Sequence, residues 1–379
     1  MQGTSPLADL IERRIRADVR AMHAYAVQNA QGMVKLDAME NPHRLSPQLQ
    51  AELGQRLGGV ALNRYPDERV HVLQEALSVR SRLPAGYALM LGNGSDELIS
   101  LLALVCAVQQ DGWTGKRAVV LAPEPGFVMY GVSAQLQGLD FVGVPLLPDF
   151  SLDTAAMLRA IARHQPAIVY LAYPNNPTAN LWDAAAMDGI VAAAASVGSL
   201  VVIDEAYQPF SSRTYRDAIA AQPERHGHVL LMRTLSKFGL AGVRLGYLAG
   251  RAELIAEIDK VRPPYNISVL NTECALFALE HADVFAAQAQ DIVLQRERLQ
   301  QAFAALPGLH AFPSQANMIL VRLDGEPSRA QAVFDALKVR SVLVKNVSKM
   351  HLLLSNCLRI TVGTATENTR LLSALQEIL

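Results

Sequence analysis

The sequence contains few cysteines and no excess of either charge. Its three cysteines, Cys106, Cys274 and Cys357, are an odd number, lie far apart and are embedded in apolar runs. This arrangement fits reduced core thiols better than a disulfide framework or a metal site. Because 34 basic residues balance 35 acidic ones, we expect no attraction to nucleic acid or to a membrane surface.

Long hydrophobic segments are also missing. Charged side chains interrupt the N-terminal stretch, so we expect no segment of the signal-peptide type. The longest useful apolar run, Leu98 to Val108, is shorter than the roughly 20 residues that span a bilayer, and it predicts a buried helix. We therefore expect a cytoplasmic protein without a membrane partner.

The apolar content is high enough for large cores, since 51% of the 379 residues are hydrophobic, and at roughly 150 residues per domain the length suggests two or three domains. Between about Ala88 and Gly250, short aliphatic runs alternate with helical stretches. This alternation predicts a mostly parallel sheet with helices on both faces. The runs are Arg117–Ala122, Phe141–Pro145, Ala167–Ala172, Leu200–Asp204, Val229–Arg233 and Val243–Ala249.

A break at Pro263-Pro264 separates this region from a second α/β pattern. We expect an N-terminal arm with part of a small domain over 1–45, a large domain over 46–264 and a small C-terminal domain over 265–379. The arm is amphipathic and could cover a second subunit. In the small domain we expect strands at Ala316–Leu323, Val342–Lys345 and Leu358–Val362, and helices after the capping-box spacings Ser328/Gln331 and Thr364/Glu367.

Lys237 and Asp204 follow two of the aliphatic runs, at the edge where open α/β sheets bind ligands. Burial would lower the pKa of Lys237 and leave a neutral amine that can form a Schiff base with a carbonyl. A carboxylate at the end of a buried strand, such as Asp204, needs a cation or strong donors, and a pyridinium nitrogen would serve. Taken alone, each residue also has a plain structural interpretation, as a solvated loop lysine and a capping aspartate.

Two loops complete a pattern around these residues. The segment Gly92–Glu97 places glycine and serine before an apolar helix, which predicts a phosphate site at a helix N-terminus. It lacks the lysine of a P-loop, and its final glutamate breaks the dinucleotide fingerprint, which argues against a nicotinamide-dependent oxidoreductase. Tyr173–Thr178 alone would be an ordinary turn. Together with Asp204, Lys237 and Arg244, however, the loops supply what pyridoxal phosphate requires.

On these residues the chain resembles the fold-type-I pyridoxal-phosphate aminotransferases, and more narrowly the histidinol-phosphate aminotransferase family. The likeness runs from Leu36–Pro42 and Asn63–Asp67 to Asn356–Gly363. It implies a large α/β domain with a mostly parallel sheet flanked by helices, a smaller α/β domain and the cofactor pyridoxal 5'-phosphate. It also implies a homodimer with shared active sites.

The resemblance implies roles for matching residues. Lys237 would hold the cofactor aldehyde, Asp204 would pair with the pyridine nitrogen, and Asn176 and Tyr207 would contact the ring hydroxyl. Lys237, Asp204 and Tyr207 are thus the expected catalytic residues. Phe127 matches the aromatic residue that stacks on the ring. The family's phosphate-binding positions are matched by Ser95, Asp96, Ser236 and Arg244.

Further matches concern the partner subunit and the substrate. Tyr65 matches a tyrosine that reaches the phosphate of the neighbouring subunit's cofactor, and Arg359 matches the arginine that holds the substrate's anionic end. A planar guanidinium suits both the carboxylate of glutamate and the phosphate of histidinol phosphate. The other implied substrate-binding positions are Tyr25, Asn41 and Lys345.

The sequence departs from the family pattern at four positions that bear on substrate choice more than on cofactor binding. Phe127 replaces a tyrosine, Met39 replaces an asparagine and Ala179 replaces a glycine. Lys345 lies near the place of an expected arginine, and its point charge does not reproduce bidentate phosphate binding.

The implied reaction is a ping-pong transamination through Lys237, in which histidinol phosphate and 2-oxoglutarate are converted to imidazole-acetol phosphate and glutamate in L-histidine biosynthesis. Two alternatives use the same cofactor: an aromatic-amino-acid aminotransferase and a threonine-phosphate decarboxylase. A third alternative is a ligand-binding module of the same fold that does not catalyse a reaction.

Overall fold

The computed structural model describes residues 6–24, 28–106 and 117–379. Contacts divide the chain into two units, residues 1–32 and residues 33–379. The described part of the first unit contains the helices α1 (Pro6–Arg14) and α2 (Ala17–Arg20), in which no residue is buried. The second unit contains the three described sheets and all the other described helices.

The large sheet has seven strands in the order β2-β8-β7-β6-β5-β3-β4. All neighbouring pairs are parallel except those made by β8, which is antiparallel to β2 and β7. This confirms the predicted fold class. The bounds are β2 Tyr87–Gly92, β3 Val119–Glu124, β4 Asp140–Pro145, β5 Ile168–Ala172, β6 Leu200–Asp204, β7 Val229–Thr234 and β8 Gly246–Arg251.

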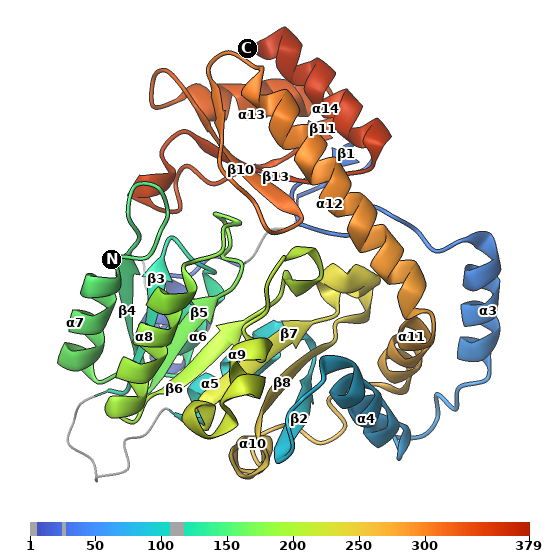
Figure 1. Cartoon of the computed structure of the whole chain (residues 1–379), viewed down its shortest axis with the longest axis vertical. Helices are drawn as coiled ribbons and strands as arrows, with labels where there is room; N and C mark the ends of the chain where they lie inside the picture. Colours follow the sequence, from blue (N-terminus) through green and yellow to red (C-terminus); the bar gives the residue numbers. More distant parts are fainter. Residues whose placement is uncertain (1–5, 25–27, 107–116) are drawn as a thin grey trace. The chain divides into compact units, whose positions relative to one another are not determined.

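Alternating side chains of the strands enter two separate cores. Helices lie on both sides of the sheet (Figure 1). Val169 and Leu171 of β5 belong to the core covered by α4 (Arg69–Ser81), α7 (Thr154–His164), α8 (Ala184–Ser196) and α11 (Val269–Glu280). Ile168 and Tyr170 belong to the core covered by α5 (Gly94–Val105), α6 (Met129–Leu136) and α10 (Ala252–Asp259). The sheet is therefore buried on both faces, which is why its strands are almost continuously apolar.

The helix predicted at Leu98 to Val108 is found as α5, and the last two residues of that run lie outside the described part of the chain. None of the described helices is long and apolar enough to cross a membrane.

A second sheet has four antiparallel strands in the order β12-β13-β10-β9, with bounds Lys345–Asn346, Cys357–Thr361, Met318–Leu323 and Leu309–Ala311. β1 (Val34–Lys35) pairs in parallel with β11 (Val342–Leu343) in a separate two-stranded sheet. The single strand predicted at Val342–Lys345 is therefore divided between two sheets.

The four-stranded sheet and the two-stranded sheet share one hydrophobic core with three helices: α12 (Ala282–Ala304), α13 (Arg329–Val339) and α14 (Ala365–Ile378). Thr364 and Glu367 form the predicted capping box at the start of α14. Ser328 precedes α13, but its side chain makes no capping hydrogen bond, so the helix is found there without the predicted cap. The remaining helices are α3 (Pro47–Gly58) and α9 (Arg216–Ala221), together with short 3-10 turns and the π-helical turn Ser236–Leu240.

Candidate active site

A cavity of about 330 Å³ opens beyond the C-terminal ends of β6 and β7. Most of the residues that the sequence analysis grouped around a cofactor line it: Ser95, Asp96, Phe127, Asn176, Asp204, Tyr207, Ser236, Lys237 and Arg244. These residues come from segments that are distant in the sequence. The segments meet because the C-terminal ends of the parallel strands lie at one edge of the sheet.

Lys237 lies in the helical turn that follows β7. Its Nζ donates a hydrogen bond to the carbonyl oxygen of Ala38 at 3.1 Å and lies 5.9 Å from the centre of the Tyr207 ring. Burial, followed by the positive charges of Arg359 and Arg244, lowers the pKa of Lys237 to about 8, although the negative charge of Glu40 acts in the opposite direction. With this pKa, roughly a tenth of the amine is neutral, and hence nucleophilic, at pH 7.

Asp204 is the last residue of β6 and is 5% exposed. Its Oδ1 accepts a hydrogen bond from the backbone N–H of Ala206 at 3.0 Å, and its Oδ2 accepts one from the hydroxyl of Tyr130 at 2.7 Å. Burial raises the pKa of Asp204 to about 6, and the two donors oppose that rise. Asp204 therefore both caps the turn after β6 and presents a carboxylate to the cavity.

The N-terminus of α5 and Arg244 form a compact anion cradle. Arg244 lies 3.5 Å from the carboxylate of Asp96, and its Nη1 donates to the hydroxyl of Ser236 at 3.3 Å. A Cβ on Gly94 would lie 2.6 Å from the Arg244 guanidinium, and the φ of Gly94 is +77°. Because only glycine allows this approach, the guanidinium and the helix N-terminus can both face one phosphate group.

Arg359, on β13, is buried beside the cavity. Its Nη1 donates to Oδ1 of Asn176 at 2.8 Å, and its Nη2 donates to the carbonyl oxygen of Asp37 at 2.9 Å. Lys345 is the register partner of Arg359 in the β12 and β13 pair. The predicted substrate residues Arg359 and Lys345 are therefore neighbours, and Arg359 is linked directly to a residue of the cavity wall.

Asn41 and Tyr65, two further predicted site residues, do not line this cavity. Asn41 donates through Nδ2 to Gln288 of α12 at 2.9 Å. Tyr65 lies between α3 and α4, is 76% exposed and stacks on Tyr265 with the ring centres 4.5 Å apart. Tyr25 lies outside the described residues.

Two of the departures from the family pattern occur where the backbone is left-handed. Met39 has φ +51° and Ala179 has φ +63°. Asparagine and glycine tolerate this conformation best, so the residues in this chain carry a steric cost. The backbone N–H of Met39 donates to the Thr361 hydroxyl at 2.9 Å, and that of Ala179 donates to the carbonyl oxygen of Asn175 at 2.9 Å, which helps to hold both turns.

Sequence reasoning assigned no role to several residues of the cavity wall, among them Glu40 and Tyr130. Tyr130 lies on α6 within an apolar stretch and is 2% exposed, so its pattern is that of a core residue. Only the folded chain shows that its hydroxyl reaches Asp204.

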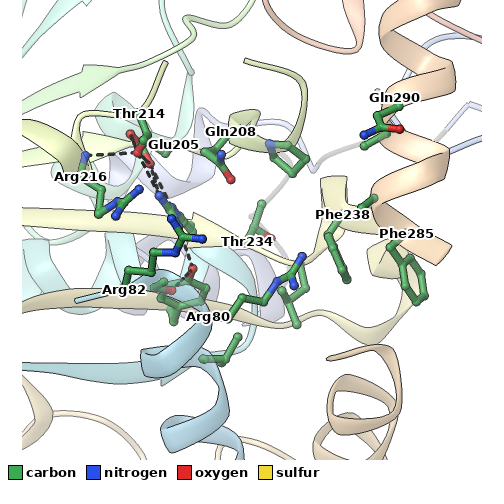
Figure 2. A pocket seen from close by; sticks show the side chains of 18 of the residues that line it. Arg80, Arg82, Glu205, Gln208, Thr214, Arg216, Thr234, Phe238, Phe285 and Gln290 are labelled. Carbon is green, nitrogen blue, oxygen red and sulfur yellow. Dashed lines mark hydrogen bonds and ion pairs between the residues drawn. The ribbon is translucent and has the colours of Figure 1, made fainter. Parts of the chain in front are cut away.

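A second cavity, of about 530 Å³, is lined by Glu205, the residue after Asp204 (Figure 2). Arg233 binds the Glu205 carboxylate at 2.7 Å, and the Thr214 hydroxyl donates to the same carboxylate at 2.8 Å. Among the described residues that line this cavity there is no lysine. Despite its larger volume, it therefore lacks an amine that could hold an aldehyde.

Comparisons with known proteins identify the family of the chain. The family described as aminotransferase class I and II matches residues 31–375. A histidinol-phosphate aminotransferase of Polaromonas naphthalenivorans is 64% identical over 375 residues, which cover 99% of each chain. One of Acidovorax sp. (strain JS42) is 62% identical over 378 residues, 99% of this chain and 100% of that one.

A solved structure is also similar: the histidinol-phosphate aminotransferase of Sinorhizobium meliloti in complex with pyridoxal-5'-phosphate, with 26% identity and a TM-score of 0.81. The match covers 96% of this chain and 97% of that one. In the present structure, the Lys237 amine, the Asp204 carboxylate, the Ser236 hydroxyl and the Arg244 guanidinium line one cavity, and their chemistry fits the aldehyde, the ring nitrogen and the phosphate of that cofactor. The chain thus belongs to the class I and II aminotransferases, as a pyridoxal-phosphate-dependent transaminase of the histidinol-phosphate aminotransferase family.

Proposed function

We propose that this chain transfers the amino group of histidinol phosphate to 2-oxoglutarate, forming imidazole-acetol phosphate and glutamate in histidine biosynthesis. The observation that carries the proposal is the buried Lys237 amine, with its lowered pKa, in one cavity with Asp204 and next to Arg359. The substrate assignment is supported by relatives of that name at 62–64% identity over nearly the whole chain.

Pyridoxal phosphate supplies an aldehyde for the Lys237 amine and a ring that withdraws electrons from the substrate's α-carbon. The chain's own residues supply the rest. Neutral Lys237 would take the proton from the substrate's α-carbon as a general base and deliver it, as a general acid, to the carbon that derives from the cofactor aldehyde. Asp204 would pair with the ring nitrogen and keep it protonated, Asn176 and Tyr207 would contact the ring hydroxyl, and Phe127 would stack on the ring.

Arg359 accounts for the two half-reactions. Its planar guanidinium can bind the carboxylate of glutamate in one half-reaction and the phosphate of histidinol phosphate in the other. Its present partners, Asn176 and the carbonyl oxygen of Asp37, hold it at the edge of the cavity. One anion site thereby serves two substrates in turn, as ping-pong kinetics requires. Lys345, its register partner, adds a second positive charge for the phosphate.

We also propose that the working enzyme is a cytoplasmic homodimer with shared sites. Tyr65 is exposed and lies outside its own chain's cavity, which is the placement required of a residue that contacts the partner's cofactor. We propose the same domain limits as above: 1–45 for the arm with part of the small domain, 46–264 for the large domain and 265–379 for the small C-terminal domain.

The test is a steady-state comparison of histidinol phosphate, phenylalanine, tyrosine and threonine phosphate as amino donors to 2-oxoglutarate, with the Lys237→Ala variant as the blank. We expect kcat/KM for histidinol phosphate to exceed that of each other donor by about 100-fold or more, because a site built for a polar group rejects ligands that lack it. Equal or higher values for phenylalanine or tyrosine would assign an aromatic-amino-acid aminotransferase. Release of carbon dioxide from threonine phosphate would assign a decarboxylase.

A further inference from the structure

The closest protein partner of the Asp204 carboxylate is the hydroxyl of Tyr130, which donates to Oδ2 at 2.7 Å. Asp204 ends β6 and Tyr130 lies on α6, so the hydrogen bond joins the strand edge to a helix on one face of the sheet. The two residues are 5% and 2% exposed. Water therefore has little access to this pair, and the bond is of the strong type made to an ionised acceptor.

The position of the Tyr130 ring is fixed by two neighbours. It stacks on Tyr170 of β5 with ring centres 4.2 Å apart and an interplanar angle of 9°, and it meets the Phe127 ring edge-on at 5.6 Å. Tyr170 is equally buried, but its hydroxyl has no hydrogen-bond partner among the described residues. Only one of the two stacked phenols is thus directed at Asp204.

We propose that Tyr130 is a positioning residue for transamination, which holds the Asp204 carboxylate in place and keeps it ionised for the cofactor's ring nitrogen. Without a cation, the surroundings of Asp204 favour its neutral form, because burial and the negative charges of Asp96 on α5 and of the adjacent Glu205 raise its pKa. Tyr207 and Tyr170, which face it from the following turn and from β5, carry no compensating charge at neutral pH. The Tyr130 hydroxyl and the N–H of Ala206 are the groups that favour the carboxylate.

The test measures the affinity of the apoenzyme for pyridoxal phosphate between pH 5 and 9, by equilibrium titration of wild type and Tyr130→Phe. Binding to a protonated ring nitrogen requires ionised Asp204, so affinity falls as the pH drops below the pKa of Asp204. Removing a donor to the ionised form raises that pKa. We expect the acid-side midpoint to move up by about 0.5–1 pH unit, the size of one charged hydrogen bond, and the Kd at pH 6 to rise about two- to fivefold as the ionised fraction of Asp204 falls.

The matched control is Tyr170→Phe, which removes a buried hydroxyl without a partner from the stacked ring and should leave the midpoint unchanged. A double-mutant cycle with Asp204→Asn gives a second measurement, since Tyr130→Phe should have no further effect on cofactor affinity when position 204 cannot ionise. With glutamate as donor we expect kcat to fall while KM stays within about twofold.

An unchanged midpoint in Tyr130→Phe, equal shifts in both phenylalanine variants, or additive effects in the cycle would each overturn the proposal. Because the main measurement is cofactor binding, its result is independent of whether histidinol phosphate is the substrate.

Discussion

At the scale of single residues, burial moves the pKa values of the two central groups towards each other. The pKa of Lys237 falls to about 8 and that of Asp204 rises to about 6, because a low-dielectric site disfavours the charge on each. Neighbouring groups then change these values in different ways. The positive charge of Arg359 lowers the pKa of Lys237 further, and the hydrogen bond from the Tyr130 hydroxyl limits the rise in the pKa of Asp204. An amine and an acid can thus work at neutral pH within one cavity.

This predicts the pH dependence of cofactor loading. The lysine must be neutral to attack the aldehyde, so the rate at which apoenzyme combines with pyridoxal phosphate should rise with pH and level off above about 8, well below the ordinary lysine value of 10.5. Stopped-flow absorbance measures this rate. In Arg359→Gln the midpoint should move to higher pH, because one positive charge that disfavours the ammonium form is gone. The surface variant Arg340→Gln is the control, and an identical profile in Arg359→Gln would refute the electrostatic account.

How far the sequence predicts the site can be judged from Asp204 and Tyr130. Asp204 stands out because a carboxylate ends an otherwise apolar run, so its place in the sequence is enough to suggest chemistry. Tyr130 occupies an apolar helix, and its hydroxyl acquires a role only when α6 packs beside β6. A side chain whose partner lies on another element gives no local signal, which is why sequence reasoning missed it.

At the scale of secondary-structure elements, the fit between β8 and α5 determines the cradle. A Cβ on Gly246 would come within 3.0 Å of the backbone of Gly94 and Ser95 and within 3.1 Å of the Arg233 carbonyl oxygen. Each of these is a backbone atom, so no side chain can rotate away. Strand β8 therefore needs glycine where it passes the helix N-terminus.

We expect Gly246→Ala to destabilise the fold by about 1–3 kcal/mol, as overpacking does, and to weaken cofactor binding by displacing α5. The control is Gly189→Ala on α8, where a Cβ meets nothing within 4 Å. That change should stabilise the protein by about 0.5–1 kcal/mol and leave cofactor affinity unchanged. Thermal unfolding and cofactor titration of both variants provide the check. Wild-type cofactor affinity in Gly246→Ala would show that the close packing is not required.

Most strands of the large sheet follow from the sequence, but β2 does not appear among the predicted runs. Its residues, Tyr87–Gly92, include no β-branched side chain, so the local preference for a strand is weak. The strand forms because it pairs with β8 along its whole length. The split of Val342–Lys345 has the same origin, since β1 and β13 provide partners in two different sheets.

At the scale of the whole molecule, apolar side chains are exposed where a second subunit would be expected to cover them. Leu7, Leu10 and Ile11 of α1 are 43–63% exposed, although their spacing is that of an amphipathic helix. Tyr65 and Tyr265 are exposed as a stacked pair. In the homodimer that we propose, burial of these side chains would stabilise the interface.

Removal of residues 1–32 should therefore weaken dimerisation. Burial of several large apolar side chains is worth several kcal/mol, so we expect the dissociation constant to rise about 100-fold or more. Sedimentation velocity over a range of protein concentrations measures it. The full-length triple variant Leu7→Ser, Leu10→Ser, Ile11→Ser should reproduce the effect without shortening the chain. If both proteins dimerise like wild type, the arm does not contribute to the interface.

The hydrogen bond from Lys237 to the carbonyl oxygen of Ala38 distinguishes the cofactor-free enzyme from the loaded one. An amine joined to an aldehyde keeps fewer hydrogens to donate, so loading takes away a donor from the strand-flanking segment that holds Ala38. The ordering of that segment therefore depends on whether the cofactor is bound. Its amide hydrogens should exchange with solvent at different rates in the cofactor-free and the loaded enzyme.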